Sequence, residues 1–141
     1  MNKLYALYVV LSSKDNEIYI VSTKEKELSI PCIEIIYPTK VKQEARYILR
    51  NFFTKDSYQF TEECSYSFLD IQEENTLDYL KSIEQFSEDN LYITYGGIAS
   101  TNILQTNFYW YKLLFNNDYL GYTTNKALNL LIDNVINKTA I

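Results

Sequence analysis

Two short clusters of carboxylates are the clearest candidates for metal or acid–base chemistry in this sequence. Glu62-Glu63 and Gln72-Glu73-Glu74 each lie beside a segment that is predicted to be a strand. Carboxylate oxygens are the ligands that Mg²⁺ and Ca²⁺ prefer. Neighbouring residues of a strand point to opposite faces, however, so neither cluster converges on one ion by itself. Solvated surface is therefore the preferred interpretation, and a divalent-cation site is the alternative.

Other catalytic groups are scarce. The chain has no His and only 2 Cys, Cys32 and Cys64, which do not have CxxC spacing. The absence of His excludes Ser-His-Asp, Cys-His and His-based acid–base chemistry. A tetrahedral zinc site needs four N or S ligands, so we expect no metal and no cofactor. Two buried, reduced thiols are the preferred interpretation and suit a cytoplasmic protein, although the sequence leaves open whether they pair.

A run of aromatic residues, Phe108-Tyr109-Trp110-Tyr111, is the strongest candidate for a binding surface. On a strand, Phe108 and Trp110 would share one face, and Tyr109 and Tyr111 the other. The preferred interpretation is a core strand whose second face is half-buried. The next interpretation is a protein interface formed by Tyr109, Trp110 and Tyr111, because Tyr and Trp supply large, rigid contact areas. Base stacking is a third.

Composition limits the remaining classes of function. The 141 residues suit a single domain, 1–141, and a 47% hydrophobic content with 3 Gly and 2 Pro indicates a folded globule. The net charge of −5 argues against sequence-independent nucleic-acid binding, which needs clustered Lys and Arg. No apolar run is long enough to span a membrane. The excess of Lys, Asn, Ile, Tyr and Phe, which have AT-rich codons, is typical of AT-rich bacteria and their phages.

Hydrophobic periodicity and turn residues predict alternating strands and helices. Strands are expected at 4–11, 17–23, 32–37, 65–71, 91–95 and 107–114. The first two form a hairpin around a polar turn at 12–16. Gly96-Gly97 is expected to be a turn or a bulge, and 116–118 a turn. Helices are expected to begin after Thr39, at a cap formed by Thr76, and at Thr124. This order predicts an α+β fold, in which helices pack on a mixed β-sheet.

The segment 28–53 is the most informative stretch of the chain. The residues after Ile30-Pro31 are apolar and β-branched, which suits a strand, and Pro38 ends it. Thr39 is then placed to cap a helix. That helix carries one apolar face, formed by Val41, Ala45, Ile48, Leu49 and Phe52. A packing helix with a solvated outer face explains this pattern without further assumption.

The same segment resembles the strand, loop and helix that carry the Nudix motif. That motif is a Gly, five residues, a Glu, seven residues, then Arg-Glu-apolar-x-Glu-Glu-x-Gly, with an apolar-Pro pair ahead of it and an Ala two residues before the Arg. Ile30-Pro31 and Ala45 match these two landmarks without a gap, and Leu49 takes the apolar position. In this register the motif positions fall on Ile33 for the Gly, Thr39 for the first Glu, Tyr47 and Ile48 for Arg-Glu, and Asn51 and Phe52 for Glu-Glu.

The resemblance implies a Nudix-like α/β/α sandwich without the catalytic residues. The family holds Mg²⁺ against a diphosphate with the motif carboxylates, and none of the six side chains present here is a carboxylate. A protein of this kind is not expected to hydrolyse diphosphates by the family mechanism.

These observations favour a non-catalytic protein-interaction or assembly module, such as a phage structural or accessory protein, in the host cytoplasm or the virion. It is expected to bind a protein partner or itself, and no membrane. The alternative is a nucleotide-binding or nucleoside-diphosphate-processing protein. It would use carboxylates that lie outside the motif, namely Glu62, Glu63, Glu73 or Glu74. An acidic inhibitor that mimics nucleic acid is a third hypothesis.

Overall fold

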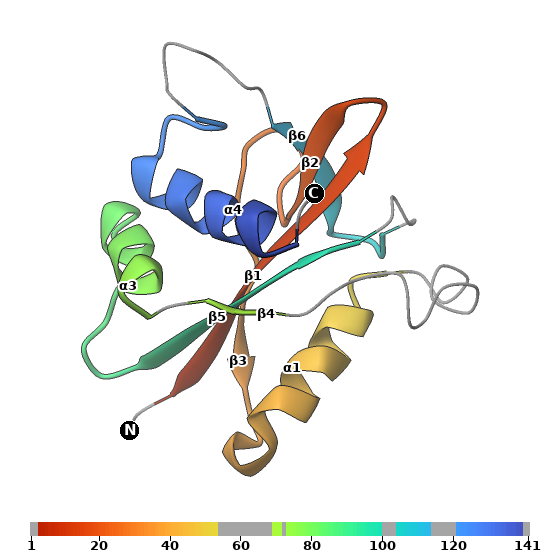
Figure 1. Ribbon diagram of the computed structural model, residues 1–141. Coiled ribbons are helices and arrows are strands. Elements are labelled where there is room, and N and C mark those ends of the chain that lie inside the picture. The colour runs from red at the N-terminus through yellow and green to blue at the C-terminus, as the bar shows by residue number, and fades with distance from the viewer. Residues whose placement is uncertain (1–2, 54–68, 72, 100–103, 114–120, 140–141) are drawn as a thin grey trace.

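Six strands and three α-helices make up the part of the chain that the computed structural model describes, residues 3–53, 69–71, 73–99, 104–113 and 121–139 (Figure 1). In chain order they are β1 (Leu4–Lys14), β2 (Glu17–Ser22), β3 (Cys32–Ile35), the 3-10 turn η1 (Pro38–Lys40), α1 (Val41–Arg50), β4 (Leu69–Ile71), α3 (Glu73–Ser82), β5 (Leu91–Ile98), β6 (Tyr109–Leu113) and α4 (Lys126–Thr139). No helix in these residues is long and apolar enough to cross a membrane.

The long strand β1 organises the sheet. Along one edge it pairs in parallel with β5, from Leu4 to Leu11. Along the other edge it pairs antiparallel with β3 near its start and with β2 near its end. The strand order is β4-β5-β1-β2-β6, with β3 beside β1. The sheet is therefore mixed, and the predicted α+β class is confirmed.

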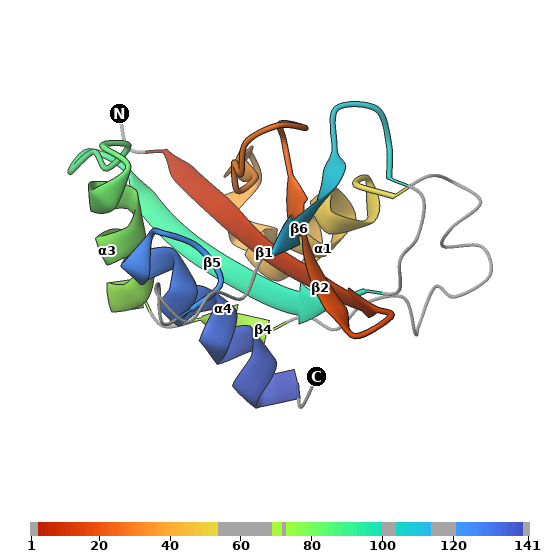
Figure 2. The same cartoon turned by 90° about the horizontal axis from the view of Figure 1, so that it is seen from above.

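Both faces of β1 are buried, because helices lie on both sides of the sheet. Leu7, Val9 and Leu11 contribute to a cluster with α3 and α4, which we call the α3–α4 core. Ala6, Tyr8 and Val10 contribute to a second cluster with α1, which we call the α1 core. Figures 1 and 2 show α1 on one face of the sheet and α3 and α4 on the other. This double coverage explains why the sequence of β1 is nearly all apolar and does not alternate cleanly.

The β1–β2 hairpin was predicted, but its turn is shorter than the polar stretch 12–16 suggested. β1 continues to Lys14, and only Asp15 and Asn16 form the turn. Both have left-handed backbone conformations, with φ of 55° and 66°. Two successive positive φ values define the type I′ turn that matches the twist of paired strands. The hydroxyl-bearing Ser12 and Ser13 therefore belong to the strand, where tertiary pairing outweighs their turn propensity.

We expect Asn16→Gly to raise the free energy of unfolding by about 0.5 kcal/mol, because Gly adopts a positive φ without a Cβ clash. Asn16→Ala, the matched control, should lower it by about 1 kcal/mol, since Ala tolerates this conformation worse than Asn does. Urea denaturation of the three proteins measures both effects. If the Gly variant is no more stable than the Ala variant, residue 16 does not have the left-handed conformation described above.

Three predicted helix starts were wrong, and a tertiary contact accounts for one of them, at Thr76. Thr39 makes no capping hydrogen bond, and α1 begins after the 3-10 turn. Thr76 lies inside α3 and is buried, and its hydroxyl donates to Thr94 Oγ1 at 2.6 Å. α4 begins at Lys126 and not at Thr124, with Asn125 Oδ1 accepting from the Leu128 N–H at 3.0 Å as its cap.

Gly96-Gly97 is also not a turn. Both glycines lie within β5 and pair with Val9 and Val10 of β1, and neither has a positive φ. The strand continues to Ile98. Its pairing with β1 supplies backbone hydrogen bonds, which glycine makes as well as any other residue. Of the strand predicted at 65–71, the described part is β4, and the turn predicted at 116–118 lies outside the described residues.

Candidate functional site

The aromatic run lies on β6, the last strand of the described sheet. Tyr109, Trp110 and Tyr111 are all half-buried. Trp110 joins the α1 core, with its ring centroid 6.5 Å from that of Phe53, whereas Tyr111 packs against the α3–α4 core. As predicted, Phe108 and Trp110 lie on the α1 side of the sheet and Tyr111 on the other, whereas Tyr109 belongs to neither core.

β6 has a strand partner on one side only among the described residues. It pairs antiparallel with β2, from Ser22↔Tyr109 to Ile18↔Leu113. In such a pair, alternate residues direct their N–H and C=O groups away from the partner strand. No described strand pairs with the outward backbone groups of β6, which lie on the same strand as Tyr109 and Tyr111.

A pocket of about 400 Å³ adjoins β6 on the α3–α4 face of the sheet. Four segments that are far apart in the sequence form its walls: the β2–β3 loop, the end of α3, β6, and the segment that leads into α4. The lining residues are Lys26, Glu27, Leu28, Tyr79, Ile83, Tyr111, Lys112, Tyr122, Thr123, Thr124, Asn125 and Leu128. A pocket of this size is large enough for a small organic molecule.

The β2–β3 wall is held in place by one buried hydroxyl. Ser22 is fully buried, and its Oγ accepts from the N–H groups of Lys24 and Ser29 at 3.2 and 3.0 Å. The same oxygen lies 2.8 Å from the Lys24 carbonyl and 3.1 Å from that of Glu27, to which it can donate. One side chain thus ties both ends of the loop that carries Lys26 and Leu28.

The opposite wall is held by one buried amide. Asn129 Oδ1 accepts from the Thr123 N–H and hydroxyl, both at 2.9 Å, and from the Tyr122 N–H at 3.3 Å. Its Nδ2 donates to the Thr123 carbonyl at 2.9 Å. The chain passes so close at Gly121 that an added Cβ would lie 2.8 Å from Asn129 Cγ. Glycine at this position is what allows the amide to reach the loop.

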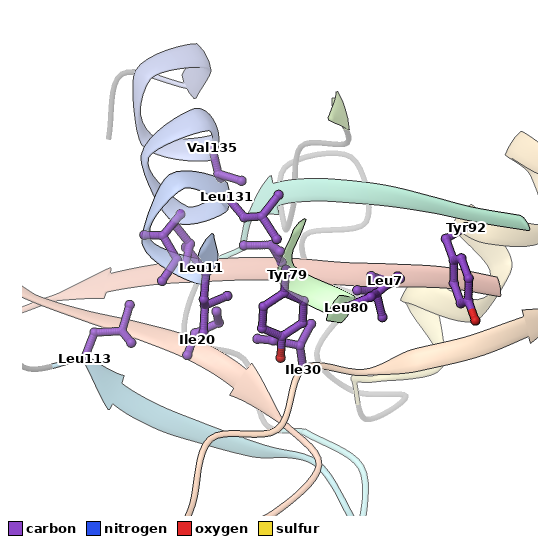
Figure 3. Packing of buried hydrophobic residues seen from close by; sticks show 13 residues of the cluster. Leu7, Leu11, Ile20, Ile30, Tyr79, Leu80, Tyr92, Leu113, Leu131 and Val135 are labelled. Carbon is purple, nitrogen blue, oxygen red and sulfur yellow. The ribbon is translucent and has the colours of Figure 1, made fainter. Parts of the chain in front are cut away.

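Tyr79 closes the floor of the pocket. It is buried, and its hydroxyl is directed toward Ile30 and hydrogen-bonds to the Ile30 backbone (Figure 3). Burial raises the pKa of Tyr79 to about 12, and the hydrogen bond from Ile30 only partly opposes this shift. Tyr122 lies higher in the wall, where burial and the neighbouring Asp133 carboxylate raise the pKa of its hydroxyl. Both phenols therefore act as neutral groups near pH 7.

Sequence reasoning missed this pocket, although one lining residue, Tyr79, and one residue that supports its wall, Asn129, carried a signal. Tyr79 lies three residues after Thr76 and four before Ile83, which is inward helical spacing. Asn129 interrupts the apolar face of α4 beside Leu128 and Ile132. A polar residue in such a position is expected to satisfy a buried partner.

The structure places the six Nudix-motif positions in different environments. Ile33, Ile48 and Phe52 pack into the α1 core, where Phe52 is fully buried. Thr39 lies exposed in the 3-10 turn, and Tyr47 is 61% exposed on the outer face of α1. Asn51 is exposed at the C-terminal end of that helix. The positions do not converge on one site.

The other candidate residues give no assembled site within the described residues. No group of three or more His, Cys, Asp and Glu side chains in that part of the chain is arranged to hold a metal ion. Glu62, Glu63, Gln72 and Cys64 lie outside the described residues, as does the side chain of Glu73, and Glu74 is exposed on α3. Cys32 carries a free thiol but is exposed on β3, so the prediction that it is buried was wrong.

Neither a protein-family model nor a curated protein matches this chain.

Proposed function

We propose that this protein is a non-catalytic interaction or assembly module, built on a Nudix-like sandwich, that binds a protein partner through the edge of β6. The observation that carries the proposal is the position of Tyr109 and Tyr111 at the end of the described sheet. A phage structural or accessory protein, in the host cytoplasm or the virion, is the setting that agrees with the composition of the chain.

An extended segment of the partner fits this edge best. A strand added beside β6 would pair with its outward N–H and C=O groups, and such main-chain hydrogen bonds supply affinity that does not depend on the partner's sequence. Tyr109 and Tyr111 lie on the same face of the strand, next to the path of the added chain. Their rings would supply contact area at a low cost in conformational entropy.

Two features support the Nudix-like part of the proposal. The predicted order of strand, Pro38 and helix is present as β3, η1 and α1, and α1 lies on one face of a mixed sheet with α3 and α4 on the other. Ile48 and Phe52, which occupy two of the aligned motif positions, pack in the α1 core. Apolar side chains in these places stabilise the attachment of α1 and provide no oxygen ligand, which favours binding over hydrolysis.

Tyr109→Ala is expected to weaken partner binding or self-association at least tenfold, the effect of losing a central aromatic anchor. Tyr37→Ala is the matched control, because Tyr37 is 60% exposed, lies outside β6 and should leave the assembly unchanged. Size fractionation of the native source, followed by sedimentation of the purified assembly with each variant, measures both effects. A wild-type chain that runs only as a free monomer, or an assembly that Tyr109→Ala leaves intact, contradicts the proposal.

A further inference from the structure

Three polar side chains that line the pocket beside β6 have no partner within the described residues. The ammonium of Lys26 and the hydroxyls of Tyr111 and Thr124 line the pocket, and none makes a hydrogen bond or ion pair with any residue of the described ranges. These groups come from the β2–β3 loop, from β6 and from the segment before α4. All three can donate hydrogen bonds, and one of them carries a positive charge.

The other polar groups of the lining are already engaged. The Glu27 carboxylate forms an ion pair of 2.7 Å with Lys24, and the Lys112 ammonium forms one of 2.7 Å with Glu17. The Asn125 amide donates to Ser82 Oγ at 3.0 Å and caps α4. Lys26 is therefore the charged lining residue that has no ion pair among the described residues.

Other residues that line the pocket supply apolar and aromatic surface. Its floor and walls include Leu28, Ile83 and Leu128, together with the ring of Tyr79. An apolar cavity with a few convergent polar groups is the usual form of a small-molecule site. Ser22 and Asn129 hold its two loop walls in place, so a ligand would lose little free energy in ordering them.

We propose that this pocket binds a small aromatic carboxylate. The ring lies against Leu28, Ile83 and Leu128, and the carboxylate accepts hydrogen bonds from Lys26, Tyr111 and Thr124. A carboxylate complements this set because it is anionic, accepts several hydrogen bonds and has no proton to donate at neutral pH. The site goes beyond the protein-interaction function and does not depend on it.

Amide NMR spectra of the ¹⁵N-labelled full chain test the site. The probes are phenylacetate, indole-3-acetate and, as a neutral isostere of the latter, indole-3-acetamide. At least one of the two carboxylates is expected to bind with a Kd below about 1 mM and to shift amides of residues 26–28, 111–112 and 122–125. Indole-3-acetamide is expected to bind at least threefold more weakly than indole-3-acetate, because it lacks the charge that pairs with Lys26.

Variants assign the roles of the donors. Lys26→Met should weaken carboxylate binding at least threefold and remove the preference for indole-3-acetate over indole-3-acetamide. Lys40→Met, an exposed lysine in η1 that does not line this pocket, is the matched control and should change neither. Unliganded spectra of both variants verify that each is folded. The proposal is overturned if neither carboxylate shifts these amides, if the acetamide binds as tightly as the acetate, or if Lys26→Met binds like the wild type.

Discussion

Tyr8→Ala is expected to lower the free energy of unfolding by about 4 kcal/mol, the largest effect that we predict for a single side chain. Tyr8 lies in the middle of β1 and is fully buried. Its ring packs edge-on against Phe52, with centroids 5.0 Å apart, and its hydroxyl donates to the Ala45 carbonyl at 2.9 Å. Truncation would leave a cavity between the sheet and α1 that the surrounding backbone cannot fill.

Two further variants separate the contributions of the ring and the hydroxyl. Tyr8→Phe keeps the ring and should cost only about 1 kcal/mol, the usual value of one buried hydrogen bond. Tyr47→Ala, the matched aromatic truncation on the exposed face of α1, should change stability by less than about 0.5 kcal/mol. Urea denaturation gives all three values. If Tyr8→Ala and Tyr47→Ala cost the same, α1 does not pack on the sheet through Tyr8.

Asn129→Ala is expected to lower the free energy of unfolding by about 2 kcal/mol. The substitution removes one amide that makes four hydrogen bonds to the segment before α4 and leaves the N–H groups of Tyr122 and Thr123 without their acceptor. The higher helix propensity of Ala offsets a part of this loss. The pocket wall formed by residues 122–125 should become more mobile as a result.

Asn137→Ala is the matched control, since it makes the same change at an exposed position of the same helix. It should be neutral or slightly stabilising. Denaturation measures the global effect, and amide hydrogen exchange of residues 122–125 measures the local one. Equal stability of the two variants, together with unchanged exchange in this segment, would show that Asn129 does not hold the wall.

Local pattern was sufficient for most of the elements. Four of the five apolar positions predicted for the helix after Pro38 are correct: Ala45, Leu49 and Phe52 are buried, and Ile48 packs against the same core, whereas Val41 belongs to neither core. Of the inward positions predicted for the last helix, Leu128, Leu131, Ile132 and Val135 are buried, and Ala127 is partly buried against the same core. Each of these predictions depends only on residues within two or three turns of one another, because a helix repeats its environment every 3.6 residues.

Predictions that depended on the local preference of a single residue were less accurate than those based on helical periodicity. Thr76 and Gly96-Gly97 have strong local preferences for a cap and for a turn, yet one lies inside a helix and the other two inside a strand. A preference of about 1 kcal/mol is smaller than the free energy gained by burying a side chain or completing a ladder of strand hydrogen bonds. Contacts with distant residues, Thr94 in the first case and β1 in the second, decide such positions.

The sequence by itself determined the α+β class, the β1–β2 hairpin and the sidedness of β6, because these follow from the spacing of apolar residues along short segments. It also determined that none of Ile33, Thr39, Tyr47, Ile48, Asn51 and Phe52, the positions that the resemblance aligns with the Nudix motif, is a carboxylate. Only the tertiary structure decided that β6 ends the described sheet and that Lys26, Tyr111 and Thr124 share one pocket. Those three residues lie on segments far apart in the chain, and neither periodicity nor local propensity specifies how such segments come together.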